Sequence, residues 1–169
     1  MTNPLYDALI APQIDRAAPL LLTDGAEITG AEFAAMAHRF AHALVVLGLE
    51  PGDRMAVQVQ KSPAALALYG AALAAGVVFL PLNTAYTPDE VAYFVENSGA
   101  VLLVCDPSAS EALGPVAAHH GAAMQTLDGT GDGSLALLAA EQPAGFDPVG
   151  RSRDDLAAIL YTSGTTGRS

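Results

Sequence analysis

The chain has 169 residues, enough for about one domain, and carries a net charge of −11. Hydrophobic residues make up 51% of the sequence and charged residues only 15%, so the chain is globular rather than disordered. An acidic surface repels nucleic-acid phosphates and anionic lipids, so we expect neither nucleic acid nor a membrane among the partners. No basic segment precedes an apolar one at the N-terminus, which predicts a cytoplasmic protein.

The first predicted elements are a strand at residues 20–23, which enters a tight turn, and a helix that starts at a capping box. Thr29 and Glu32 form this box, because the Thr hydroxyl accepts from an amide three residues on while the Glu carboxylate reaches back. Apolar side chains then recur at the helical period up to Gly48, where we expect the helix to end.

An alanine-rich helix lies between predicted strands at residues 55–59 and 77–80. The uncharged stretch 64–82 reaches the length of a transmembrane segment. Pro63 opens the helix and Gly76 closes it, which leaves about 13 helical residues, or roughly 20 Å. This helix is too short to span a membrane, so we predict a buried helix that runs into a buried strand.

Two further capping boxes, at residues 87–90 and 108–111, predict two more helices. The run 101–105 between them is continuously apolar, as in strands of a parallel sheet that is covered on both faces. Cys105 ends this run, and we expect it to be a small buried side chain rather than a nucleophile.

The last third of the chain is predicted to hold loops and one more strand. Residues 128–133 resemble calcium loops in glycine and acid spacing but lack their length and closing Glu, so we predict no metal there. Residues 141–153 are predicted to form a linker-like surface loop, and residues 156–161 a buried strand. Helices and strands that alternate with short loops predict an α/β fold, in which helices cover a largely parallel sheet.

Several polar residues have a structural explanation. His38 and His42 are spaced so that they could bind a metal from one helix, but they lie opposite its apolar stripe. We therefore expect both to face solvent. Asp53 and Arg54 are expected to stabilise the turn before a strand, and Tyr161 is assigned no chemistry.

The strongest chemical signal is the polar run after the last predicted strand. Residues 162–169 include five hydroxyl side chains and two glycines. Glycine lets a backbone turn sharply so that successive amides point at an anion, and this composition suits either a phosphate cradle or a plain polar turn. The spacing is not that of the nucleoside-triphosphate P-loop. No G-x-G-x-x-G follows a strand, which argues against a doubly wound nucleotide-dependent oxidoreductase.

Residues 161–167, Tyr-Thr-Ser-Gly-Thr-Thr-Gly, are similar to the phosphate motif of the adenylate-forming superfamily. This superfamily includes acyl-CoA synthetases, luciferases and nonribosomal-peptide adenylation domains. Segments 48–56 and 76–83 resemble two of its other landmarks in the same order. Residues 80–87, followed by 101–107, look particularly like bacterial malonyl-CoA synthetases.

The resemblance implies an ATP-dependent acyl-CoA ligase whose substrate is malonate or a related small carboxylic acid. The carboxylate attacks the α-phosphorus of ATP to give an acyl-adenylate, and the thiol of coenzyme A then displaces AMP. Mg²⁺ and coenzyme A are implied for the full-length enzyme. The resemblance assigns phosphate binding to one set of residues, Thr162, Ser163, Gly164, Thr165, Thr166 and Gly167. It assigns no catalytic residue and no metal ligand within this chain.

The family motif continues with a lysine and a glycine after the position of Ser169. We therefore interpret residues 1–169 as the N-terminal portion of the adenylating domain, without the C-terminal domain, and expect the isolated chain to be inactive. We expect surfaces exposed by truncation to favour self-association. The alternative interpretation is a non-catalytic phosphate-binding or interaction module, complete as it stands.

Overall fold

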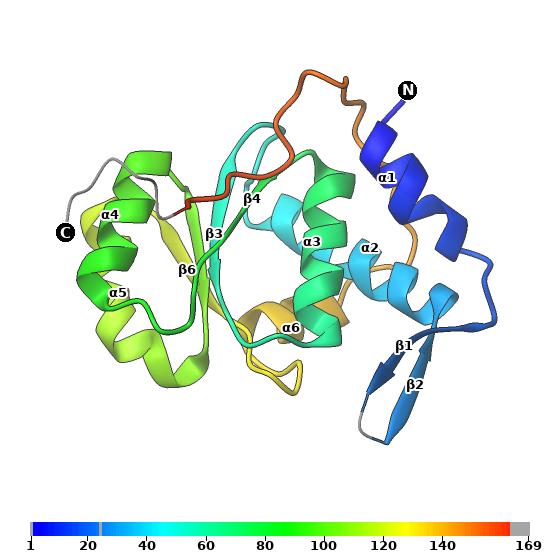
Figure 1. Ribbon diagram of the computed structural model, residues 1–169, viewed down its shortest axis with the longest axis horizontal. Coiled ribbons are helices and arrows are strands. Elements are labelled where there is room, and N and C mark those ends of the chain that lie inside the picture. Colours follow the sequence, from blue (N-terminus) through cyan, green and yellow to red (C-terminus); the bar gives the residue numbers. More distant parts are fainter. Residues whose placement is uncertain (1, 24, 163–169) are drawn as a thin grey trace.

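A four-stranded parallel sheet with helices on both faces forms the centre of the computed structural model, which describes residues 2–23 and 25–162 (Figure 1). The helices α2, α3 and α6 lie on one side of this sheet, and α4 and α5 lie on the other. A two-stranded hairpin, β1 and β2, projects from the first side. The predicted α/β fold is confirmed.

The elements alternate along most of the chain. The α-helices are α1 (Pro4–Leu9), α2 (Gly30–Val46), α3 (Pro63–Ala75), α4 (Pro88–Ser98), α5 (Ser110–His119) and α6 (Ser134–Ala140). The strands are β1 (Pro19–Thr23), β2 (Ala26–Thr29), β3 (Arg54–Gln58), β4 (Val78–Pro81), β5 (Leu102–Cys105) and β6 (Ala123–Thr126). Two short 3₁₀ turns, Ala11–Gln13 and Pro107–Ala109, complete the set.

The strand order of the sheet is β4-β3-β5-β6, and every neighbouring pair is parallel. The chain leaves β3 through α3 to β4, crosses back through α4 to β5, and continues through α5 to β6. Because these crossovers put helices on both faces, the inner strand β5 is buried along its whole length. This covering explains the apolar run at residues 102–105, whereas Val101, which precedes the strand, is 37% exposed.

Successive side chains of β3 supply two separate cores, because neighbouring residues of a strand point to opposite faces. Met55 and Val57 belong to the core beneath α2, α3 and α6. Ala56 belongs to the smaller core beneath α4 and α5, which also contains Leu103 and Cys105 of β5.

Local signals in the sequence are confirmed at several helix ends. The capping boxes of Thr29 with Glu32 and of Thr87 with Glu90 are both present, and Gly76 ends α3 in a left-handed conformation, as predicted. The third predicted box is wrong. The Asp106 carboxylate instead accepts from the Ser108 amide and starts a 3₁₀ turn, and α5 begins afterwards without a side-chain cap.

The last predicted strand is also only partly correct. Within residues 156–161, a single parallel bridge joins Ala158 to Phe79 of β4. Leu156 and Leu160 are 61% and 72% exposed, so the segment is not buried as expected. It lies along the outer edge of β4, where the described residues cover it incompletely.

Short elements were missed for a different reason. Helices α1 and α6 have six and seven residues, and strands β2 and β6 have four each. Six or seven residues are too few for the helical period to be read reliably. Strands β2 and β6 lack the continuous apolar run that identifies β4 and β5, which are equally short. In the portion that the structure describes, no helix combines the length and the apolar character that a membrane span needs.

Candidate functional site

The predicted phosphate-binding residues fall at the limit of what the structure describes. Thr162 is the last described residue, and it is exposed. Ser163, Gly164, Thr165, Thr166 and Gly167 lie outside the described residues. The structure therefore shows the elements that lead into this segment rather than the segment itself.

Backbone hydrogen bonds join the approach to the candidate site to the edge strand β4. The Phe79 amide donates to the Ala157 carbonyl at 3.0 Å, and the Ile159 amide donates to the Phe79 carbonyl at 3.0 Å. The pairing is parallel, so the chain at Ala158 runs in the same direction as the sheet strands. In open parallel sheets, ligands bind beyond the carboxyl ends of the strands. The chain therefore enters the candidate segment with the polarity that such a site needs.

Tyr161 joins the end of this approach to α4. Its hydroxyl donates to Asn97 Oδ1 at 2.5 Å, and its ring centroid lies 4.7 Å from that of Phe94. Partial burial, and secondarily the nearby Tyr93, raises the pKa of Tyr161, so the hydroxyl stays protonated and able to donate. The sequence alone assigned Tyr161 no chemistry. No local pattern identifies its hydrogen-bond partner, because Asn97 lies 64 positions earlier in the chain.

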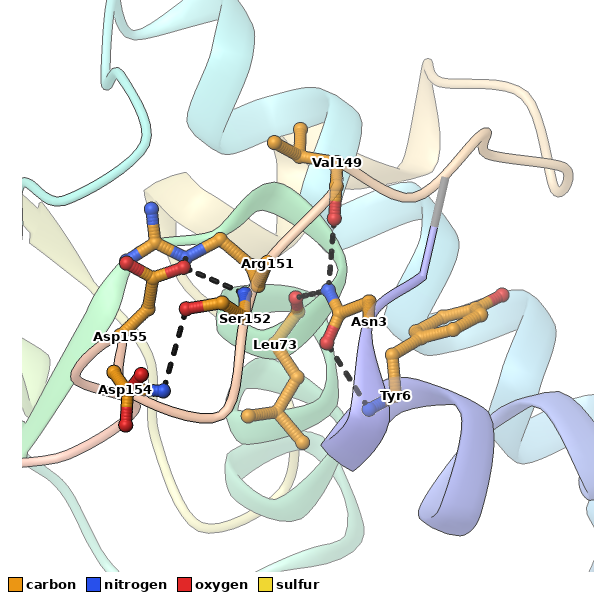
Figure 2. Close-up of polar contacts among 8 residues, drawn as sticks. All are labelled: Asn3, Tyr6, Leu73, Val149, Arg151, Ser152, Asp154 and Asp155. Carbon is orange, nitrogen blue, oxygen red and sulfur yellow. Dashed lines mark hydrogen bonds and ion pairs between the residues drawn. The ribbon is translucent and has the colours of Figure 1, made fainter.

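Further upstream, Asn3 anchors the loop that leads to this approach (Figure 2). Asn3 Nδ2 donates to the carbonyls of Leu73 and Val149, at 2.8 and 3.0 Å, while Oδ1 accepts from the Tyr6 amide at 3.3 Å. One side chain therefore ties the start of α1 to the last turns of α3 and to the loop 141–153. This loop is at the surface as predicted, but it is anchored and does not behave as a linker.

A compact turn follows at residues 152–155 (Figure 2). The Asp155 carboxylate accepts from the Ser152 amide at 2.6 Å, and this hydrogen bond lowers the pKa of Asp155. Arg151 Nε lies 3.7 Å from the same carboxylate. A pocket of about 270 Å³ lies beside this turn, and its lining includes Asn3, Gly76 and Leu156. The pocket lies where α3 ends and β4 is about to begin, at the amino ends of the strands. Ligands of open parallel sheets are expected at the opposite, carboxyl ends.

The expectation that His38 faces solvent is wrong. Its side chain is only 4% exposed, with Nε2 at 2.8 Å from the Tyr6 hydroxyl and Nδ1 at 2.9 Å from the Ala144 carbonyl. His42 is partly covered too, because Nε2 bonds the Gly145 carbonyl at 2.7 Å. Helix α1 and the loop 141–153 cover this face of α2, which an amphipathic pattern on α2 alone does not reveal. Desolvation by burial lowers the pKa of His38.

Two other sequence interpretations are supported. Arg54 donates through Nε to the Ser98 carbonyl and through Nη2 to the Gly99 carbonyl, and the Asp53 carboxylate accepts from the Glu50 amide. This pair therefore has the structural role that was predicted. Cys105 is buried, and desolvation raises the pKa of its thiol to about 11, so it is not activated as a nucleophile.

Across residues 2–23 and 25–162, no group of three or more His, Cys, Asp or Glu side chains is placed to hold a metal ion.

Comparison with known proteins places this geometry in a family. The family described as "AMP-binding enzyme" matches residues 8–169. The ATP-bound structure of MatB from Rhodopseudomonas palustris superposes with a TM-score of 0.94 at 46% identity, over 99% of this chain and 34% of that one. The apo structure of MatB gives a TM-score of 0.93 at 45% identity.

Curated sequences are similar over most of the chain. The long-chain-fatty-acid–CoA ligase FadD13 of Mycobacterium tuberculosis is 30% identical over 98% of this chain and 31% of its own length. A feruloyl-CoA synthase of Amycolatopsis is 35% identical over 85% of this chain and 27% of its own length. The chain thus spans about a third of the length of the relatives that it matches.

Proposed function

Because the chain belongs to the AMP-binding family of ATP-dependent, adenylate-forming acyl-CoA ligases, we propose that its protein activates malonate or a related small acid. The acid reacts with ATP to form an acyl-adenylate and pyrophosphate, and coenzyme A then receives the acyl group. The observation that carries this proposal is the 46% identity with ATP-bound MatB over 99% of the chain.

The choice of acid rests on two sequence features. Residues 80–87 and 101–107 resemble bacterial malonyl-CoA synthetases. Identity with MatB, at 45–46%, also exceeds the 30% and 35% found with ligases named for long-chain fatty acids and for a feruloyl group. The first feature favours a small acid, and the second places the ligases named for a long-chain or an aromatic acid at a greater distance from this chain.

For Thr162, Ser163, Gly164, Thr165, Thr166 and Gly167 we propose binding of the ATP phosphates. Support comes from the match of residues 161–167 to the superfamily motif and from the exposed position of Thr162 after the β4-edge segment. Formation of the adenylate brings a carboxylate close to an anionic polyphosphate. Hydroxyl and amide donors of this segment, once they contact the phosphates, would lower this electrostatic cost. Mg²⁺, when bound, would supply further neutralisation of the phosphates.

Residues 1–169 are proposed to be the N-terminal portion of the adenylating domain. The chain covers 34% of the MatB structure, so we propose that turnover needs the remainder of the protein. We propose no nucleic-acid or membrane partner, in keeping with the net charge of −11.

The test is pyrophosphate release by the gene product extended beyond Ser169, with ATP, coenzyme A and one acid at a time. Malonate is expected to give the highest kcat/KM, and a long-chain fatty acid and ferulate to give little release. The 169-residue chain, as a matched control, is expected to give none. Formation of no acyl-adenylate from any acid would overturn the proposal. ATP binding without turnover would favour the non-catalytic phosphate-binding module.

A further inference from the structure

We propose that Asn97 and Phe94 of α4 are positioning residues for the ATP phosphate segment and act through Tyr161. This inference rests on the proposed function of residues 162–167. It adds structural support for that segment from α4, in which Asn97 lies 64 positions before Tyr161 in the sequence.

Tyr161 is in the right place to transmit such an effect because it directly precedes Thr162. Backbone pairing with β4 extends to Ile159. Among the residues that the structure describes, the hydrogen bond holding the chain beyond Ile159 comes from the Tyr161 side chain. Loss of this bond would leave the start of the phosphate segment free to shift relative to the sheet.

The two contacts on Tyr161 restrain different motions. The bond to Asn97 Oδ1, at 2.5 Å, fixes the position of the hydroxyl. Ring packing on Phe94, with centroids 4.7 Å apart and planes at 54°, restricts movement of the ring. Tyr86 packs on the same Phe94 at 5.0 Å, which holds Phe94 in place from another direction.

Helix α4 is itself held firmly, as a support must be. The Thr87–Glu90 box caps its first turn, and Val91 and Val95 are buried against the sheet. At its other end, Arg54 of β3 donates to the carbonyls of Ser98 and Gly99 at 2.9 and 2.8 Å. Tyr161 is therefore connected through α4 to β3, one of the two inner strands of the sheet.

The experiment uses the gene product extended beyond Ser169 and compares Tyr161→Phe, Asn97→Leu, Asn97→Asp and the double variant Tyr161→Phe/Asn97→Leu. Tyr93→Phe is the matched control, since Tyr93 is on the same helix, is 56% exposed and contacts Phe94 without bonding Asn97 in the described structure. The measurements are KM for ATP, kcat and KM for the acid in pyrophosphate release, the Kd for ATP by titration calorimetry, and the thermal midpoint.

A net hydrogen bond of ordinary strength corresponds to a rise in KM and Kd for ATP of about 2- to 10-fold. This rise is expected in Tyr161→Phe and Asn97→Leu, with KM for the acid and the thermal midpoint unchanged. The double variant should be no worse than either single variant, because both remove the same bond. Asn97→Asp retains an acceptor and Tyr93→Phe leaves the bond intact, so both should match the wild type.

Unchanged ATP binding in both single variants, additive effects in the double variant, or an equal effect of Tyr93→Phe would overturn the inference. If the wild type itself neither binds ATP nor forms an acyl-adenylate, the proposed function fails and this inference fails with it. Normal turnover by the wild type together with unchanged variants would refute the positioning role alone.

Discussion

The two faces of the sheet are built differently (Figure 1). Beneath α2 and α3 the core is the larger one, and the helices approach so closely that a Cβ at Gly70 would lie 3.1 Å from Ala37 Cβ. Beneath α4 and α5 the core is smaller, and it is bordered by partly exposed aromatic residues, among them Phe94 and Tyr161. The comparison indicates that the first face contributes most to stability, while the second receives Tyr161, which directly precedes the segment that we propose to bind ATP phosphates.

The largest expected effect contrasts one leucine on each face. Leu68→Ala in α3 and Leu113→Ala in α5 each empty a buried site, since the side chains are 0% and 2% exposed. Such changes cost about 2–5 kcal/mol of unfolding free energy. We expect Leu68→Ala in the upper half of this range and Leu113→Ala in the lower half, measured by urea unfolding. A larger loss for Leu113→Ala would contradict the assignment of stability to the α2–α3 face.

A smaller effect is expected from His38, which links α2 to α1 and to the loop 141–153. His38→Leu leaves the Tyr6 hydroxyl and the Ala144 carbonyl without their partner, and we expect a loss of about 1–3 kcal/mol in urea unfolding. His119→Leu, at an exposed position on α5, is the control and is expected to change stability little.

The same residue predicts a pH dependence. Burial lowers the pKa of His38 in the folded state, so the unfolded chain binds its proton first as the pH falls. The stabilising contribution is therefore complete above the unfolded pKa of about 6.5 and is lost as the pH falls toward the lowered folded value. Unfolding free energy measured from pH 8 to pH 5 should decline more in the wild type than in His38→Leu. Parallel profiles would show that His38 does not carry this dependence.

The two capping boxes allow a matched comparison across the sheet, because one starts α2 and the other starts α4. Thr29→Ala and Thr87→Ala are each expected to cost about 1 kcal/mol. Hydrogen bonds from Thr29 and Thr87 lower the pKa of Glu32 and of Glu90, so these contacts weaken only when acid protonates the carboxylates. Thermal unfolding near neutral pH would test the pair, and a difference of several kcal/mol between them would contradict equal local contributions.

The smallest effect concerns Cys105 on the α4–α5 face. Burial raises its thiol pKa to about 11, so alkylation at pH 8 should be very slow in the folded chain and rapid in concentrated urea. Rapid modification under native conditions would indicate that the smaller core opens more readily than its packing suggests.

Much of the fold was predictable because its signals are local. A Thr with Glu three residues later needs only its own backbone to form a capping box, and Gly76 ends α3 because it adopts a left-handed conformation without a Cβ penalty. Asn3 before Pro4 is a further helix-start pattern that was present in the sequence and was missed. The third predicted box does not form, because the carboxylate of Asp106, two residues before Ser108, accepts a hydrogen bond from the Ser108 amide.

The features of the candidate site likewise divide into those read from the local sequence and those that depend on long-range contacts. By its order alone, the sequence determined the hydroxyl- and glycine-rich run at residues 162–167, the family motif that it matches and the parallel character of the sheet. Only the tertiary structure decided that His38 is buried, that Ala158 pairs with β4 and that Tyr161 bonds Asn97. Each of these contacts joins residues separated by 32 or more positions, and which distant residues meet is set by how helices pack on the sheet rather than by local propensity.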